Sequence, residues 1–277
     1  MDLTDKVVVI TGGGGGIGAA LARRFHAEGA RHIAIADLDA GTAATVASEV
    51  AGSSHSLDAA DEQAVADLVE KVSAAHGPID LFCANAGIAT GGDVFSKEWQ
   101  RTWDVNVMSQ VYAARAVIPG MVARGEGYLL LTASAAGLTT SFDSAPYAVT
   151  KHASVALAEW LAITYGDQGI GVSCLAPQFV DTPMGRLAGE SSEGAAAWVQ
   201  TIMIEPDAVA ESVVAGLADK RFLILPHPEV AEYFQNKAAD YDRWLGGMRK
   251  LSRGLSVPPA SGASVRGEGT AEPEAQG

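Results

Sequence analysis

The stretch KVVVITGGGGGIG, residues 6–18, places five consecutive glycines directly after an apolar, strand-like run. Glycine-rich segments can be flexible linkers, but a backbone without Cβ atoms can also press against a phosphate. Here the run opens a helical segment, residues 17–28, and a second strand-like run, 32–36, follows it and ends beside Asp37. A linker would not sit between a buried strand and the helix packed on it. Because helix N-termini bind anions, this unit predicts a dinucleotide site with Asp37 at the ribose.

The rest of the chain continues the alternation of strands and helices. The strands are continuous apolar runs, which are typical of a parallel sheet covered on both faces. We therefore predict an α/β fold with a doubly wound, seven-stranded parallel sheet and helices on both faces, as a single domain followed by a C-terminal helix. The expected strands are 6–10, 32–36, 54–57, 79–84, 127–132, 171–176 and 222–225, and the expected helices are 17–28, 40–50, 62–75, 97–123, 147–165 and 206–218.

Three parts follow from this pattern: a dinucleotide-binding catalytic domain over 1–226, an amphipathic extension over 227–253, and a tail over 254–277. The tail is rich in Gly, Ser, Pro, Ala and Glu, which predicts disorder. In the extension, an apolar stripe is expected to dock on its own domain, with another subunit or the active site as alternatives. The stripe comprises Val230, Phe234, Tyr241, Leu245 and Met248.

Composition excludes several classes of protein. The 277 residues include 19 Lys and Arg against 33 Asp and Glu, a formal charge of −14, which argues against binding to nucleic acid or anionic membranes. There is no apolar run of about 18 residues, so no membrane span is expected. The start MDLTDK does not resemble a signal peptide, and Cys83 and Cys174 lie in apolar runs as buried thiols, which together indicate the cytoplasm. The histidines form no ligand-like cluster, so we expect no metal.

The chemistry is carried by YAVTK, residues 147–151. Tyr147 and Lys151 are four residues apart on a predicted helix, so they share one face. Tyrosine is a poor base at neutral pH, but a neighbouring ammonium group lowers its pKa by favouring the phenolate. Taken alone, the pair is better explained as part of an ordinary surface helix, because this spacing is common.

The pair is accompanied by further motifs in a fixed order. They are Thr-Gly-x-x-x-Gly-x-Gly at 11–18, Asn-Ala-Gly at 85–87, Asn106 in DVNVMS, Ser134 in LTASAAG and Tyr-x-x-x-Lys at 147–151. Together they closely resemble the short-chain dehydrogenase/reductase family, in its single-domain branch, over residues 3–226. The resemblance implies an NAD-dependent oxidoreductase that transfers hydride between a secondary alcohol or ketone and the nicotinamide.

The resemblance also implies a role for individual residues. Tyr147 would be the acid/base, Ser134 would bind the substrate oxygen, Lys151 would hold the nicotinamide ribose, and Asn106 would hold a water in a proton relay. Cofactor contacts are expected from Gly12, Gly16, Ile17, Gly18, Asp37, Leu38, Asp58, Asn85, Gly87, Tyr147, Lys151, Val180 and Thr182. Substrate contacts are expected from Ser134, Phe142, Tyr147, Gln178, Phe179 and Met184.

Several features bear on specificity. Asp37 carries a negative charge and is not followed by Arg or Lys, which favours NAD over NADP. The substrate segments are mainly apolar and offer only Arg186 to an anion, which favours an apolar substrate. Where relatives have Pro-Gly after the sixth strand, this chain has Pro177-Gln178, which alters the pocket mouth.

The family resemblance also implies a homo-oligomer that pairs the helices 97–123 and 147–165, expected to be a tetramer with a dimer as the alternative. Their apolar surface is expected at Val111, Tyr112, Val117, Met121, Val155, Leu157, Trp160 and Leu161. Two other functions stay open: a cofactor-binding regulator without catalysis, and another reaction on the same fold, such as isomerisation or dehydration. The non-catalytic regulator is disfavoured because the chain keeps all four expected catalytic residues, Ser134, Asn106, Tyr147 and Lys151.

Overall fold

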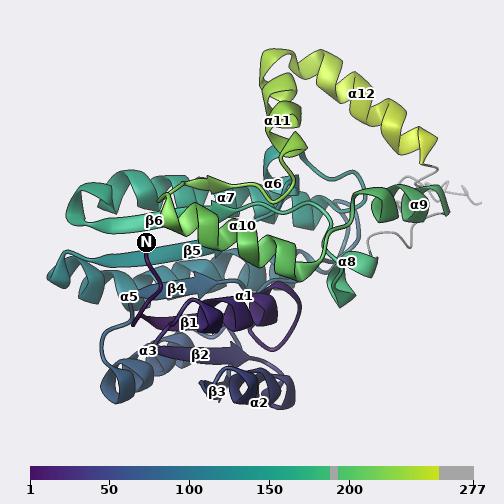
Figure 1. Cartoon of the computed structure of the whole chain (residues 1–277). Coiled ribbons are helices and arrows are strands. Elements are labelled where there is room, and N and C mark those ends of the chain that lie inside the picture. Colours follow the sequence, from purple (N-terminus) through teal and green to yellow (C-terminus); the bar gives the residue numbers. More distant parts are fainter. Residues whose placement is uncertain (188–192, 256–277) are drawn as a thin grey trace, which may run out of the picture.

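A computed structural model describes residues 1–187 and 193–255. The described residues form a seven-stranded parallel sheet in the order β3-β2-β1-β4-β5-β6-β7 (Figure 1). The strands are β1 Val7–Thr11, β2 His32–Asp37, β3 Ser53–Ser56, β4 Leu81–Ala84, β5 Gly127–Thr132, β6 Ile170–Leu175 and β7 Leu223–Ile224. The predicted doubly wound fold is confirmed, and the strand bounds differ from the expected ones by at most two residues.

Helices cover both faces of the sheet, because the strands are apolar on both sides and every such face must be kept from water. On one face lie α1 Gly16–Ala27, α2 Ala40–Glu49 and α10 Pro206–Ala218 (Figure 1). On the other face lie α3 Glu62–His76, α5 Ser109–Arg124 and α7 Ala145–Tyr165. Each face has its own apolar cluster, with Phe25 fully buried in the first and Phe82 in the second.

The strand order determines where a ligand can bind. From β1 the chain moves outward to β2 and β3, and it then returns to the other side of β1 to form β4. The loops after β1 and β4 therefore diverge and leave a crevice beyond the carboxyl ends of these strands. The glycine run follows β1, and Asn85 follows β4, so both lie at this crevice.

The segment predicted as one helix over 97–123 has three parts. It begins as α4 Trp99–Trp103, continues as one turn of π-helix over Asp104–Met108, and ends as α5. Single π-helical turns inside α-helices occur frequently at functional sites. This turn contains Asn106.

Three further helices were not expected from the sequence. They are α6 Ala136–Thr139, α8 Pro183–Leu187 and α9 Glu193–Ile202, and each lies in a segment that follows a strand. α6 and α8 are only four and five residues long, too short for an apolar period to reveal them.

The C-terminal extension consists of two helices, where one was predicted. α11 Glu229–Ala239 ends at Asp240, whose carboxylate caps α12 Tyr241–Gly254 by accepting from the N–H of Arg243 at 2.9 Å. The break divides the predicted stripe, so Val230 is buried in the core whereas Phe234 and Tyr241 are exposed. α12 extends one residue into the predicted tail, and residues 256–277 lie outside the described part.

A buried lysine attaches the extension to the helices beside the sheet. Lys237 on α11 donates to the carbonyl oxygen of Leu138 at 2.7 Å and to His152 Nε2 at 3.2 Å. His152 Nδ1 lies 2.8 Å from the carbonyl oxygen of Ala148, so Nδ1 carries the proton and Nε2 is free to accept. Burial lowers the pKa of Lys237. α11 is thereby joined to α6 and α7, the two elements next to the predicted catalytic residues.

Other expectations concern the core and the surface. Cys83 and Cys174 are buried free thiols, as predicted. Of the apolar residues expected at a subunit interface, Val117, Met121, Val155 and Leu161 are instead buried in the core. Within the described ranges, no helix is both long and apolar enough to cross a membrane.

Candidate active site

A cleft of about 1210 Å³ opens at the carboxyl ends of the strands. A pocket for one small ligand usually occupies about 300–1000 Å³, so this cleft has room for two molecules side by side. Its walls come from the loops after β1, β4, β5 and β6 and from both C-terminal helices. Of the predicted site residues it is lined by Gly12, Gly16, Ile17, Asp37, Asn85, Gly87, Ser134, Phe142, Tyr147, Lys151, Gln178, Phe179, Val180, Thr182 and Met184.

The glycine run forms a tight turn from β1 into α1. Gly12 and Gly16 have φ of +63° and +51°, in the left-handed region that favours glycine. Gly18 packs against the start of the turn, where a Cβ atom would lie 2.1 Å from the carbonyl oxygen of Gly12. The turn can therefore form only with glycine at these positions, and it leaves the first N–H groups of α1 available to an anion.

Two side chains hold this turn in place. Asp37, at the end of β2, accepts from the N–H of Gly14 at 2.9 Å. Asn85, just after β4, donates to the carbonyl oxygens of Thr11 and Gly12 at 3.1 and 3.2 Å, and it accepts from Thr132 Oγ1 at 3.1 Å. Asn85 thus joins β1, β4 and β5 at the floor of the cleft.

Ser134 and Tyr147 meet on the opposite wall of the cleft. Ser134 follows β5, is buried, and accepts from the N–H of Ala136 at 3.1 Å. Tyr147 lies in the first turn of α7, whose N-cap Ser144 accepts from the N–H of Tyr147 at 3.1 Å. Burial raises the pKa of Tyr147, and its hydrogen bond with Ser134 opposes this by lowering it. The direction is the reverse of the one expected from Lys151, because burial is the larger effect.

Lys151 lies one helical turn after Tyr147 and is 4% exposed. Its ammonium group donates to the carbonyl oxygen of Thr132 at 3.0 Å and lies 5.6 Å from the centre of the Tyr147 ring. Burial lowers the pKa of Lys151 to about 8. The side chain is therefore still mainly cationic at pH 7 and loses its charge as the pH rises through 8.

Asn106 lies behind this group, fully buried in the π-helical turn. Its amide donates to the carbonyl oxygen of Ile88 at 3.0 Å and to Thr150 Oγ1 at 3.1 Å, and its side-chain oxygen accepts from the N–H of Ile88 at 2.8 Å. Its own carbonyl oxygen accepts from Ser154 Oγ at 3.1 Å. Asn106 therefore ties the loop after β4 to α7.

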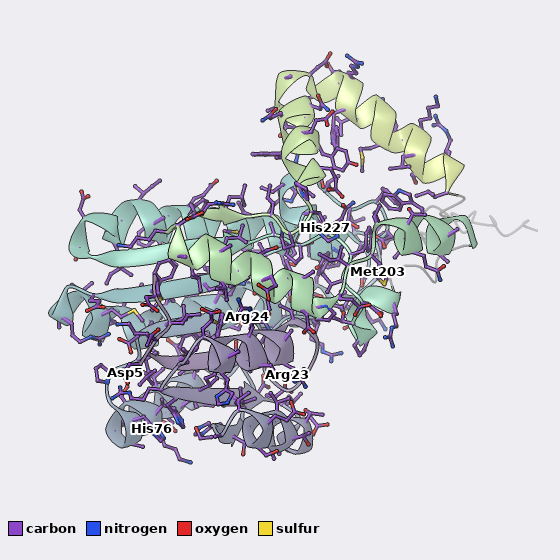
Figure 2. The ribbon with its side chains drawn as sticks, in the orientation of Figure 1. Asp5, Arg23, Arg24, His76, Met203 and His227 are labelled. Atoms are coloured by element: carbon purple, nitrogen blue, oxygen red, sulfur yellow. The ribbon has the colours of Figure 1, made fainter. Side chains whose placement is uncertain are left out.

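The unusual Gln178, which follows β6, is held by a histidine that follows the neighbouring strand β7. The N–H of Gln178 donates to His227 Nδ1 at 3.2 Å, and His227 Nε2 donates to the carbonyl oxygen of Ile202 at 3.0 Å. Figure 2 shows His227 close to Met203, where the segment after α9 passes the loop after β7. Besides Gln178, this bridge positions the α8–α9 segment, which supplies Met184 and Trp198 to the cleft.

Four predicted residues do not line the cleft. Gly18 and Asn106 support it from behind, as described above. Leu38 is 73% exposed, and Asp58 is exposed and accepts from the N–H of Ala60 at 2.9 Å. The sequence interpretation missed the C-terminal part of the wall, which includes Tyr233, Asn236, Arg243, Trp244, Met248 and Leu251. Of these residues only Met248 belongs to the predicted apolar stripe, for which the active site was one of the expected alternatives.

The family model for short chain dehydrogenases matches residues 6–193, about two thirds of the chain. The chain belongs to the short-chain dehydrogenase family. The matched range includes the glycine turn, Asn106, Ser134, Tyr147 and Lys151 and ends before α10. The C-terminal helices that complete the cleft lie outside this range.

Similar proteins include two that are named as dehydrogenases. The 2,5-dichloro-2,5-cyclohexadiene-1,4-diol dehydrogenase of Sphingobium indicum is 34% identical, with 79% of this chain and 92% of that protein covered. The meso-2,3-butanediol dehydrogenase of Serratia marcescens is 33% identical, over 66% and 75% of the two chains. Among solved structures, a short-chain dehydrogenase/reductase from Burkholderia phymatum in complex with NAD has a TM-score of 0.77 and 26% identity, covering 96% of this chain and all of that one. These comparisons support an oxidoreductase.

Proposed function

We propose that this chain is an NAD-dependent dehydrogenase or reductase that acts on a secondary alcohol or its ketone. The observation that carries the proposal is the joint arrangement of Ser134, Tyr147 and Lys151 on one wall of a cleft whose opposite wall is the glycine turn. Residues 1–226 would form the catalytic domain and 227–253 its cover. A cytoplasmic location stays a prediction.

The residues of the cleft suit a dinucleotide on geometric grounds. The turn at Gly12–Gly18 lets a pyrophosphate approach the N-terminus of α1, and the Asp37 carboxylate at the end of β2 can accept from ribose hydroxyls. Lys151 would hold the second ribose from the side of α7. When bound, the nicotinamide accepts or donates the hydride.

The protein's own contribution is to move one proton. In the oxidation direction, Ser134 orients the alcohol oxygen by hydrogen bonding, and the Tyr147 hydroxyl, once deprotonated, takes the proton from that oxygen. The Lys151 ammonium favours the deprotonated tyrosine by its positive charge. Asn106 would hold a water that leads the proton from Lys151 to solvent. In reduction the same groups act in reverse.

The proposal is tested by the ultraviolet absorbance of reduced nicotinamide, with purified protein and a panel of secondary alcohols and ketones. Turnover that requires both NAD and a compound of this class supports it. Conversion of a carbonyl compound without net change in the nicotinamide would indicate isomerisation or dehydration instead. Cofactor binding without any turnover would indicate a regulator.

We expect catalytic efficiency with NAD to exceed that with NADP by at least tenfold. A 2′-phosphate would meet the Asp37 carboxylate, and like charges at about 4 Å and an effective dielectric near 20 cost roughly 4 kcal/mol. Even a third of that energy is about tenfold in affinity. The measurement is kcat/KM with both cofactors for the wild type, Asp37→Ala, and the control Asp39→Asn, which keeps the cap of α2. Comparable efficiency of the wild type with NADP would refute the expectation.

The substrate end of the cleft favours an apolar molecule. Phe142, Phe179 and Met184 line the cleft, and Phe179 packs edge-on against Trp198 with ring centres 5.5 Å apart, which supports an apolar surface at this end. Arg186, the cation that the sequence offered to an anion, pairs with Asp181 at 2.6 Å and is not available. We therefore propose a mainly apolar alcohol or ketone.

We also expect a homo-oligomer, most simply a tetramer built on two-fold axes. Val149, Trp160 and Ile163 are exposed at 46%, 56% and 82% along α7, and α11 and α12 leave them uncovered. Light scattering of the full chain is expected to give a tetramer, and Trp160→Glu with Ile163→Glu is expected to dissociate it. Trp160→Phe with Ile163→Val keeps the apolar surface and serves as the control. A fully active wild-type monomer would contradict this expectation.

A further inference from the structure

α12 carries three arginines whose guanidinium groups form no ion pair and no hydrogen bond within the described part of the chain: Arg243, Arg249 and Arg253. Every other arginine of the described residues contacts a carboxylate or a backbone carbonyl group. These paired arginines are Arg23, Arg24, Arg31, Arg101, Arg115, Arg124, Arg186 and Arg221. Among the described arginines, the unpaired ones are thus confined to the helix that covers the cleft.

The charge of α12 contrasts with that of the whole chain. The helix has Lys250 and these three arginines against Asp242 alone, in a protein with a formal charge of −14. Its apolar residues Trp244, Met248 and Leu251 line the cleft, so the helix turns its apolar side toward the cleft. Like charges that are this close repel each other. A bound anion would relieve that repulsion.

Two of the arginines line a hollow of their own. This groove has a volume of about 330 Å³ and lies between α12 and the segment after α6. Its apolar part is formed by Phe142, Leu245 and Met248, and its polar part by Thr140, Ser252, Arg249 and Arg253. No carboxylate is among these lining residues of the described chain, so none of them competes for the arginines or repels an anion.

The groove adjoins the active-site cleft. Thr140, Phe142 and Met248 line both. A molecule held at Ser134 and Tyr147 that extends past Phe142 and Met248 therefore reaches the arginines. Arg249 and Arg253 are one helical turn apart, so both can donate to the same oxyanion.

We propose that Arg249 and Arg253 form an anion-binding subsite for an oxyanion, a carboxylate or a phosphate, at the far end of a mainly apolar substrate. The identification of the ligand as the substrate rests on the proposed function, whereas the binding of the anion does not. An extended anionic surface, such as a membrane or a nucleic acid, fits less well because the rest of the protein is strongly acidic and repels it. A single small oxyanion fits the groove.

The test is binding of three probes of equal chain length, decanoate, decyl phosphate and decanol, below the concentrations at which they form micelles. Affinity is measured on the full chain by tryptophan fluorescence, since Trp244 lines the cleft. We expect decanoate or decyl phosphate to bind about tenfold more tightly than decanol, because the contact with the arginines is charge-assisted. The binding of the anion should weaken with added salt. The better of the two anions identifies the group that the subsite takes.

The variants separate the groove from charge in general. Arg249→Gln with Arg253→Gln is expected to abolish the preference for the anion and to leave decanol affinity unchanged. Lys250→Gln removes a positive charge from the same helix without touching the groove, and it should keep the preference. An equal affinity of the wild type for all three probes, or a preference that survives the double substitution, would overturn the subsite.

Two further outcomes distinguish a small-anion subsite from a membrane contact and from a failure of the proposed function. Sedimentation of the protein with anionic vesicles tests for a membrane contact. The proposal would be overturned if the wild type sediments with the vesicles, the double variant does not, and the wild type shows no preference for monomeric anions. Binding is measured without turnover, so an inactive protein that still prefers decanoate contradicts only the proposed function. If a ketone with a terminal carboxylate is reduced, the double variant should raise its KM about tenfold with little change in kcat.

Discussion

Replacing Tyr147 with phenylalanine is expected to lower kcat by about 10²–10⁴-fold, the usual contribution of general acid/base catalysis, while the affinity for NAD changes little. The substitution removes only the hydroxyl group that hydrogen-bonds with Ser134 and leaves the ring beside Lys151. Steady-state kinetics gives kcat, and calorimetry gives the affinity. A variant that keeps more than about a tenth of the wild-type rate would show that another residue carries the proton.

Two comparisons make the result specific. Tyr128→Phe removes a buried tyrosine hydroxyl of the same kind, which bonds with Ser173 Oγ at 2.8 Å away from the cleft, and it should keep kcat while losing about 1 kcal/mol of stability. Lys151→Ala should impair both cofactor binding and rate. Because burial raises the pKa of Tyr147, alcohol oxidation should increase with pH up to about 8, above which Lys151 loses the charge that favours the phenolate, and the phenylalanine variant should lose this dependence.

The fold and the chemical centre could be predicted because local patterns determine them. A strand followed by a glycine turn and a helix requires little beyond residues 6–28, and the spacing of Tyr147 and Lys151 places both on one face of any α-helix. The expected pKa of Tyr147 was wrong in direction because burial depends on the whole fold. The sequence shows the positive charge of Lys151, but it does not show that the Tyr147 side chain is buried.

The outer wall of the cleft could not be predicted, because long-range contacts position it. The break at Asp240 looks like any helical aspartate in the sequence, yet it turns α12 across the cleft and separates it from α11. Lys237 reads as a surface cation, but its partners are 99 and 85 residues away, at Leu138 and His152. The position of α12 over the cleft, on which the proposed anion subsite depends, could not be predicted for the same reason. On these proposals, substrate specificity depends on the segment that the family motifs do not cover.

The glycine turn itself provides a second large expected effect. Gly18→Ala should lower the free energy of unfolding by about 1–3 kcal/mol and weaken NAD binding at least tenfold. An alanine Cβ atom would lie 2.1 Å from the carbonyl oxygen of Gly12, so either α1 or the turn must move, and the N–H groups at the start of α1 move with it. Thermal unfolding and calorimetric titration with NAD measure the two effects.

Gly15 offers a matched control three residues away in the same turn. Its φ of −166° and ψ of 176° suit any residue, and a Cβ atom there would have no neighbour within 4 Å among the described residues. Gly15→Ala should therefore keep NAD affinity and change the free energy of unfolding by no more than about 1 kcal/mol, because the entropy that alanine saves is offset by its weaker preference for the N-cap position of α1. If both variants bind NAD equally well, the close packing of Gly18 on Gly12 does not shape the cofactor site. If both variants lose NAD affinity, any atom added to the turn disturbs the cofactor site, and the clash at Gly18 is not the specific cause of the loss.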